Sequence, residues 1–114
     1  MKTIFFVEDD DALQDIARLV FTPPDFAICI FSSAEELLAE ERCPDVYVLD
    51  KQLRGMDGLA LCRLLKAAPP TANIPVVMVS AAPDIKALAA SAGANAALEK
   101  PFSIHEMIDV VVNV

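Results

Sequence analysis

The chain alternates short apolar runs with segments in which apolar residues recur every three or four positions. The apolar runs, which predict strands, are residues 3–7, 26–31, 46–50, 75–80 and 95–99. A segment with helical spacing follows each run, and Pro or Gly interrupts the chain before each later run begins. Because a strand, a helix and a parallel strand form a crossover that packs back on the sheet, this order predicts an α/β fold. We expect a doubly wound, five-stranded parallel sheet with helices on both faces.

The predicted helices show their buried faces as apolar stripes. These stripes are Leu13, Ile16, Ala17 and Val20; Leu37 and Leu38; Leu61, Leu64, Leu65 and Ala68; the alanine-rich stretch 85–92; and Ile104, Met107, Ile108 and Val111. The segments 33–36 and 103–106 have the Ser-x-x-Glu spacing of a capping box, which predicts that a helix begins at each of them.

The central run, residues 46–50, is apolar without interruption until it ends on Asp50. Such a run is typical of a strand that is buried on both faces of a parallel sheet. Ligand crevices in these sheets lie beyond the carboxyl ends of the strands, so a strand that ends on an acid presents that acid to a ligand. Asp50 is therefore the first candidate for chemistry.

Polar side chains at the other strand ends are expected to join Asp50 at one edge of the sheet. They are Glu8 and Asp9, Ser80 and Lys100. Neighbouring carboxylates repel one another unless a cation neutralises them, and Mg²⁺ suits oxygen ligands that are completed by phosphate. One carboxylate could then attack phosphorus and form an acyl phosphate, while Lys100 neutralises charge and Ser80 donates a hydrogen bond.

Charge and composition limit the classes of partner that the protein could bind and indicate its cellular compartment. The net charge of −8 disfavours nucleic acid and anionic membrane as direct partners, because both bind basic surfaces. The apolar start of the chain is cut short by acids at 8–11, well below the length of a signal peptide's apolar region, so a cytoplasmic protein is expected. Cys29, Cys43 and Cys62 lack the spacing of a metal site, which predicts reduced, buried thiols.

Four motifs, taken in order, resemble the receiver domains of two-component response regulators across nearly the whole chain. They are Val7-Glu8-Asp9-Asp10; Val48-Leu49-Asp50 with Gly55-Met56-Asp57-Gly58; Val79-Ser80-Ala81; and Glu99-Lys100-Pro101-Phe102. The resemblance implies a flavodoxin-like sheet with the strand order 2-1-3-4-5. It also implies that the chain is not an enzyme but a phosphoacceptor signalling domain that assists its own phosphorylation and dephosphorylation. Its partners would be a sensor histidine kinase or phosphotransfer protein, and an output domain or protein target.

The same resemblance implies roles for the acidic residues. Asp50 is similar to the phosphoacceptor, and Asp9 to a direct ligand of Mg²⁺. Asp50 would also contact the metal, Glu8 would act on it through a bound water, and Gln52 would contribute its backbone carbonyl.

The resemblance extends to the last two strands, but with a departure. Ser80 and Lys100 are similar to the family's hydroxyl and lysine, and Pro101 to the proline after a peptide bond that is often cis. Three residues before the lysine, where the family usually has Tyr or Phe, this chain has Ala97. Leu98 cannot replace that ring, because alternate strand residues face opposite sides of the sheet. The usual switch, in which a ring fills space vacated by the hydroxyl, therefore lacks its ring here.

Two further interpretations compete with the phosphoacceptor. An aspartyl phosphatase commonly has Asp-x-Asp, whereas residues 50–52 are Asp-Lys-Gln, and the chain has no cap domain to form a substrate pocket. A phosphate-independent interaction domain is favoured by Ala97 but disfavoured by the intact set of acids, hydroxyl and amine. Lys51 and Arg54, which replaces the family's usual proline, would be either solvated loop charges or recognition charges for a partner kinase.

Simpler roles also exist for single residues. Asp50 alone could close a turn, Asp10 or Asp11 could cap the first helix, and Ser80 could cap a later one. Lys100 alone could be a solvated surface amine. His105, the only histidine, has no nucleophile or metal ligand near it in sequence and is expected on the surface.

Length and hydropathy define one domain, residues 1–114, since compact domains most often have about 100 to 150 residues. The last predicted helix ends on the largely apolar residues 111–114, which predicts that the chain continues in a longer parent protein. The last helices show no clear set of paired charges, so the sequence predicts neither a monomer nor a dimer. Neither the cognate kinase nor the regulated process is encoded in a recognisable motif.

Overall fold

The computed structural model describes residues 1–114, and its elements alternate strand and helix from one end to the other. The strands are β1 (Lys2–Val7), β2 (Phe26–Phe31), β3 (Val46–Asp50), β4 (Val76–Ser80) and β5 (Ala96–Glu99). The helices are α1 (Asp11–Val20), α2 (Ala34–Leu38), α3 (Gly58–Ala67), α4 (Ile85–Ser91) and α5 (Ile104–Asn113). The predicted alternation of elements is therefore confirmed.

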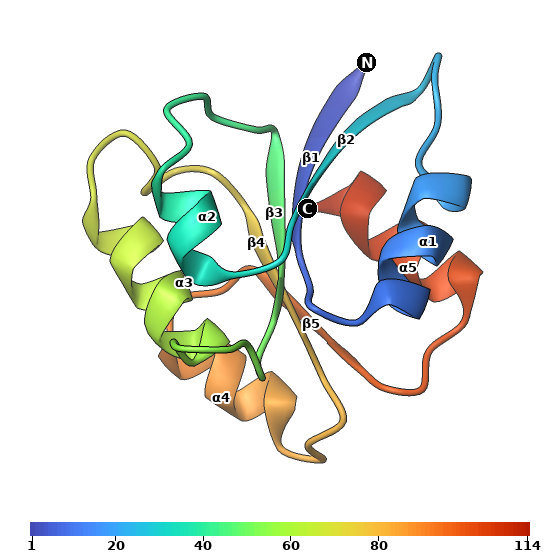
Figure 1. Cartoon of the computed structure of the whole chain (residues 1–114). Helices are drawn as coiled ribbons and strands as arrows, with labels where there is room; N and C mark the ends of the chain where they lie inside the picture. The colour runs from blue at the N-terminus through green and yellow to red at the C-terminus, as the bar shows by residue number, and fades with distance from the viewer.

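The strands form one parallel sheet in the order β2-β1-β3-β4-β5. Figure 1 shows α1 and α5 on one face of this sheet and α2, α3 and α4 on the other. The strand order reverses at β1 and β3, the position at which doubly wound sheets open a crevice beyond the strand ends. The predicted flavodoxin-like topology is confirmed, and it places the ends of β1 and β3 side by side.

Two hydrophobic clusters cover the two faces of the sheet. In β3, Val46 and Val48 belong to the cluster under α1 and α5, whereas Tyr47 and Leu49 belong to the cluster under α2, α3 and α4. Alternate side chains of a strand point to opposite faces, so a strand covered on both sides needs apolar residues at every position. This burial explains the continuous run that ends on Asp50.

The buried faces of several helices differ from the apolar stripes that the sequence predicted. Ile16, Leu64 and Ile104 are 40%, 49% and 53% exposed, although each was expected on a buried face. In α1 the predicted Ala17 is buried, but the other buried position is Gln14, which was not part of the predicted stripe. Apolar residues occupy a wider arc of these helices than the sheet can cover, so spacing alone leaves their rotation undetermined.

The cysteines are free thiols, as predicted, but they are not all buried. Cys62 lies on α3 and is buried, Cys29 is half-buried in the edge strand β2, and Cys43 is exposed. Cys43 lies in the loop before β3, where neither cluster reaches it. The prediction of a buried thiol is therefore wrong for Cys43.

The predicted capping box is present at the start of α5, whereas the start of α2 has a different arrangement of the same hydrogen bonds. At α5, Ser103 and Glu106 exchange both bonds of the box. At α2, the Ser33 hydroxyl accepts from the Glu36 N–H, but the Glu36 carboxylate accepts from the N–H of Ser32, one residue before the expected position. No helix is both long and apolar enough to cross a membrane.

Candidate functional site

The carboxyl ends of four strands meet around one hollow of about 350 Å³. Its lining includes Glu8 beyond β1, Asp50 at the end of β3, Ser80 at the end of β4 and Lys100 beyond β5. Asp9, Asp10, Gln52 and Ala81 complete the lining. The structure therefore brings together all the residues that the sequence placed at this edge.

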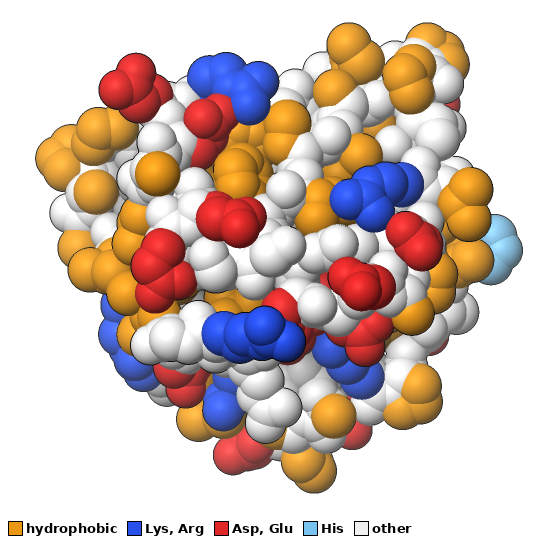
Figure 2. Space-filling model, in the orientation of Figure 1, with side chains coloured by type: hydrophobic (Ala, Val, Ile, Leu, Met, Phe, Trp, Pro, Cys, Tyr) orange, Lys and Arg blue, Asp and Glu red, His pale blue; other side chains and the backbone are white.

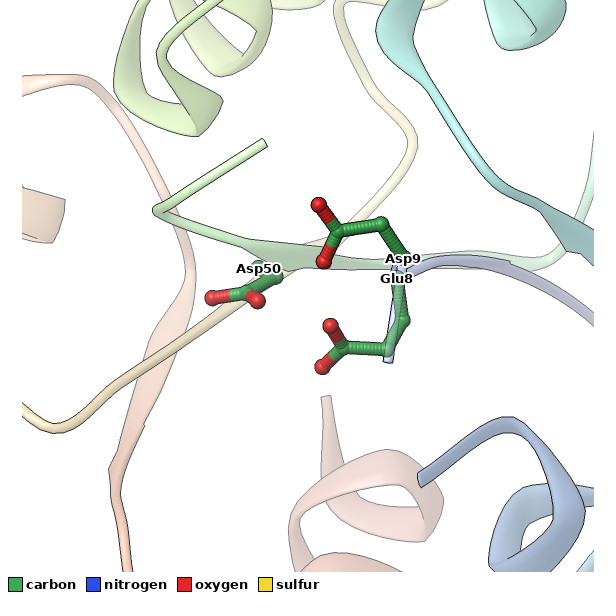
Figure 3. A group of neighbouring side chains, drawn as sticks. All are labelled: Glu8, Asp9 and Asp50. Carbon is green, nitrogen blue, oxygen red and sulfur yellow. The ribbon is translucent and has the colours of Figure 1, made fainter. Parts of the chain in front are cut away.

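Three carboxylates form the acidic part of the hollow. Glu8, Asp9 and Asp50 each offer one oxygen, and these oxygens lie within 4.8 Å of one another. Figure 3 shows Glu8 and Asp9 extending from neighbouring backbone positions toward a common space that the Asp50 carboxylate also faces. Glu8 is only 1% exposed and Asp50 7%, so water screens their repulsion poorly.

Lys100 is the amine closest to these acids. Its Nζ lies 3.4 Å from Glu8 Oε1 and 3.5 Å from Asp50 Oδ2. The Lys100 N–H donates to the Ser80 carbonyl at 2.7 Å, which ties the end of β5 to the end of β4 and fixes where the lysine leaves the sheet. The Lys100–Pro101 peptide bond is cis, as the resemblance implied. Lys100 is therefore no freely solvated surface amine.

Glu8 holds its proton more tightly than an ordinary glutamic acid. Burial, reinforced by the adjacent Asp50 carboxyl group, raises the pKa of Glu8 from 4.5 to about 7. The Lys100 amine and the Asp10 N–H oppose this shift without cancelling it. Without a cation, the hollow thus keeps part of its negative charge neutralised by a proton.

Gln14 supports the acidic site and was not recognised in the sequence. Its side-chain amide, buried on α1, donates to the Glu8 carbonyl at 2.6 Å and to the Ser32 hydroxyl at 3.2 Å. These bonds join the ends of β1 and β2 and fix the backbone that carries Glu8. The available signal was a polar residue three positions before Ala17, on the same helical face.

Asp50 combines a turn role with its place in the site. Its Oδ1 accepts from the Gln52 N–H at 3.2 Å, the turn bond that an isolated Asp commonly makes. Its Oδ2 faces Lys100. The turn bond therefore orients the carboxylate and leaves the second oxygen toward the hollow.

Ser80 keeps its proton available for donation. The hydroxyl is buried and accepts from the Ala82 N–H at 3.0 Å, which leaves its own hydrogen free. It does not cap α4, because Asp84 occupies that position. Ser80 is thus a donor at the rim of the hollow rather than a helix cap.

The remaining candidates lie outside the hollow or at its margin. Asp10 caps α1 through the N–H groups of Ala12 and Leu13, and His105 is exposed. Ala97 packs toward α4 beside a separate hollow of about 270 Å³, whereas Leu98 belongs to the opposite cluster. The expectation that Leu98 cannot replace a ring at position 97 is confirmed.

The residues at this edge fit a hard divalent cation. Three carboxylates face one amine, and their oxygens are close enough to share one ion. Burial, reinforced by the Asp50 carboxyl group, raises the pKa of Glu8 to about 7, so a cation near it would lower the cost of its ionisation. Mg²⁺ is a cation that prefers such oxygen ligands.

On the face that Figure 2 shows, Lys and Arg side chains lie singly among Asp and Glu rather than forming a basic surface.

We expect the metal-free protein to lose the Glu8 contribution to stability as pH rises from about 4.5 to about 7. A carboxyl group with a raised pKa binds its proton more tightly in the folded state, so that stabilisation is complete at low pH and disappears above the folded pKa. At 1.36 kcal/mol per pKa unit, the loss is on the order of 3 kcal/mol. Melting curves in EDTA at pH 5 and pH 8 measure it.

Glu8→Gln is the matched variant, because the amide does not titrate while the other carboxylates titrate in both proteins. The stability difference between wild type and variant should therefore favour wild type more at pH 5 than at pH 8. A difference that is the same at both pH values would contradict the assignment of a raised pKa to Glu8.

Comparison with known proteins gives a consistent set of relatives. The family model described as response regulator receiver domain matches residues 4–112. The phosphate regulon transcriptional regulatory protein PhoB of Rhizobium meliloti (strain 1021) is 32% identical over 114 residues, which cover 95% of this chain and 49% of that protein. The DNA-binding response regulator MtrA of Mycolicibacterium smegmatis is 30% identical over 111 residues, covering 94% of this chain and 47% of that protein.

A solved structure agrees with these relatives. The crystal structure of a candidate response regulator from Chloroflexus aurantiacus J-10-fl has a TM-score of 0.92 and 31% identity, covering 98% of this chain and 95% of that one. The chain spans about half the length of the curated relatives it matches.

Proposed function

The chain belongs to the response regulator receiver domain family, and from that premise we propose that it accepts a phosphoryl group on Asp50 with the help of Mg²⁺. The family is a signalling component of two-component systems. The observation that carries the proposal is the meeting of Asp50 with Glu8, Asp9 and Lys100 at one buried edge.

The reaction is a transfer from phosphohistidine or a small phosphodonor to a carboxylate. An oxygen of Asp50 attacks phosphorus, the bond from phosphorus to the donor nitrogen or oxygen breaks, and the departing imidazole or carboxylate keeps the electron pair. If the second ring nitrogen of the phosphohistidine carries a proton, imidazole leaves as a neutral molecule; if it does not, the departing imidazolate takes a proton from water. The Gln52 N–H already orients the attacking carboxylate, so this chain supplies positioning rather than proton chemistry.

Mg²⁺, held by Asp9, Asp50 and the Gln52 carbonyl, with Glu8 acting through a water, would neutralise the charge of the phosphoryl oxygens. Lys100 adds a fixed positive charge beside Asp50 Oδ2. Ser80 donates its free hydroxyl hydrogen to a phosphoryl oxygen. Together these groups favour the phosphorylated state, which an output domain or separate protein then recognises.

The donor is a sensor histidine kinase or a phosphotransfer protein, as for a domain of this family. The curated relatives are about twice as long as this chain, so their additional half is where an output would lie. For the present chain the output partner is proposed only by its class.

The test of this function is incubation with acetyl phosphate and Mg²⁺, followed by intact-mass measurement. We expect a mass increase of one phosphoryl group. The increase should be absent when EDTA is present during the incubation, because without the metal the three carboxylates repel the incoming dianion. A folded protein that gains no mass in Mg²⁺ over a wide range of donor concentration would overturn the proposal.

A phosphate-independent interaction domain is the second candidate, and Ala97 is the residue that favours it. The hollow of about 270 Å³ beside β5 is lined mainly by alanines, and no ring of this chain fills it. A switch that depends on burying a ring there has no differential free energy to use. Absence of phosphorylation in the experiment above, with the fold intact, would favour this candidate.

A further inference from the structure

A short turn between β3 and α3 carries a basic side chain to the mouth of the acidic hollow. Gln52 and Asp57 form an antiparallel bridge at the base of the turn, and Gly55, with φ of 81°, allows the chain to reverse. Leu53 and Met56 pack against the hydrophobic cluster on the α2, α3 and α4 face. The backbone of the turn is therefore anchored on both sides of residue 54.

Arg54 lies between these two anchors, with its side chain 88% exposed. Its Nε is 3.9 Å from Asp9 Oδ2. An anchored backbone with a long, solvated side chain can release this contact without moving the fold. The turn thus holds a solvent-exposed cation beside one of the three carboxylates.

The other nearby cations are paired with different acids. Lys100 contacts Glu8 and Asp50, and Lys51 lies 3.9 Å from Asp57 Oδ2. Arg54 is thus the one basic side chain that forms an ion pair with Asp9. No second positively charged side chain of the protein lies within ion-pair distance of the Asp9 carboxylate.

We propose that Arg54 is the resident counter-ion of Asp9, which a divalent cation must displace, and that it thereby sets the metal affinity of the site. This role rests on the proposed function, because the cation is the one that the receiver site binds. A guanidinium within ion-pair distance of a metal ligand repels the incoming ion. An exposed ion pair is weak, so the divalent ion displaces Arg54 from Asp9. The ion nevertheless binds less tightly than it would without Arg54.

The first test is a calorimetric Mg²⁺ titration of the whole chain as wild type, Arg54→Gln and Arg63→Gln. Arg63 is exposed on α3 and forms no ion pair, so its variant makes the same change in net charge away from Asp9. We expect Arg54→Gln to bind Mg²⁺ about twofold to fivefold more tightly than wild type, the range of one exposed ion pair. Arg63→Gln should stay close to wild type.

The gain should also depend on salt. At about 1 M ionic strength the Debye length is about 3 Å, so the difference between wild type and Arg54→Gln should largely disappear. A difference that persists unchanged would indicate an altered turn rather than a removed charge, and would overturn the proposed role.

The second test follows Arg54 directly by NMR of the arginine Nε–Hε groups. The Arg54 cross peak, assigned by its absence in Arg54→Gln, should shift when Mg²⁺ is added to wild type. Arg18 and Arg42, paired with Asp15 and Glu40, should not shift and serve as internal controls.

The outcomes separate this role from the underlying function. Mg²⁺ binding that is identical in wild type and Arg54→Gln, with an unmoved Arg54 cross peak, overturns the role of Arg54 and leaves the metal site intact. If none of the three proteins binds Mg²⁺, the proposed metal site fails, and the role of Arg54 fails with it.

Discussion

Asp50→Asn should abolish acyl-phosphate formation while leaving the protein folded. An amide is a poor nucleophile and a poor ligand for Mg²⁺, so both the attack on phosphorus and the binding of the metal are lost. Asn has the same shape as Asp and can still accept from the Gln52 N–H, so the turn after β3 should persist. Intact-mass measurement after incubation with acetyl phosphate and Mg²⁺ checks the result.

Asp57→Asn is the matched control for this variant. It makes the same chemical change in the same connection, but Asp57 caps α3 by accepting from the Leu59 N–H, and Asn is an equally good cap. We expect Asp57→Asn to be phosphorylated close to the wild-type level. Phosphorylation of Asp50→Asn at the wild-type level would move the acceptor to another residue and refute its assignment to Asp50.

Gly58→Ala should destabilise the protein by about 3 kcal/mol or more, the upper part of the range for overpacking. A Cβ at Gly58 would lie 2.0 Å from the Asp50 carbonyl oxygen and 2.8 Å from Lys51 Cα, both of them backbone atoms. Relief of this clash requires the end of β3 and the start of α3 to separate, which would break the bond from the Gly58 N–H to the Lys51 carbonyl. For a domain of this size the melting temperature should fall by at least about 12 °C.

Gly93→Ala provides the comparison, because it adds the same methyl group without a backbone clash. Its φ of 87° is costly for Ala, at about 1 to 2 kcal/mol, but the new Cβ would meet only the Lys66 side chain, at 3.4 Å. Denaturant unfolding should therefore rank wild type, Gly93→Ala and Gly58→Ala in decreasing stability. A Gly58→Ala protein as stable as Gly93→Ala would show that the strand and helix are not packed as closely as described.

Gly58 also links the site to the fold, since the clash it avoids is with the residue proposed to accept phosphate. The same glycine is the last residue of the motif 55–58, which is one of the four motifs that resemble the receiver family. The structure supplies the physical reason: helix α3 begins so close to the end of β3 that only a residue without a side chain fits between them.

The order of the strands and helices, and the polar residues at the strand ends, follow from the amino-acid sequence alone. Continuous apolar runs require strands buried on both faces, and strands separated by helices must run parallel, so their last residues meet at one edge. Glu8, Asp50, Ser80 and Lys100 each follow or end such a run. Their meeting could therefore be predicted without coordinates, because it depends on chain direction alone.

The buried face of each helix, in contrast, is set by packing in the folded protein. Ile16 and Leu64 fit the predicted stripes as well as their neighbours do, yet they are exposed, while the polar Gln14 is buried. Gln14 is tolerated inside because its amide donates to the Glu8 carbonyl and the Ser32 hydroxyl, two acceptors from other parts of the chain. Helix rotation depends on such long-range partners, which a local pattern does not contain.

The electrostatics of the site likewise required the folded chain. The raised pKa of Glu8 depends on its burial and on the distance to Asp50, and the contact of Arg54 with Asp9 depends on how the turn after β3 is anchored. The energy of a charge interaction depends on the distance between the groups and on the exclusion of water, and neither can be predicted from the amino-acid sequence alone. The order of residues therefore determines which groups lie at the ends of the strands, whereas folding determines their further partners, such as Gln14 and Arg54, and how strongly each group is charged and screened.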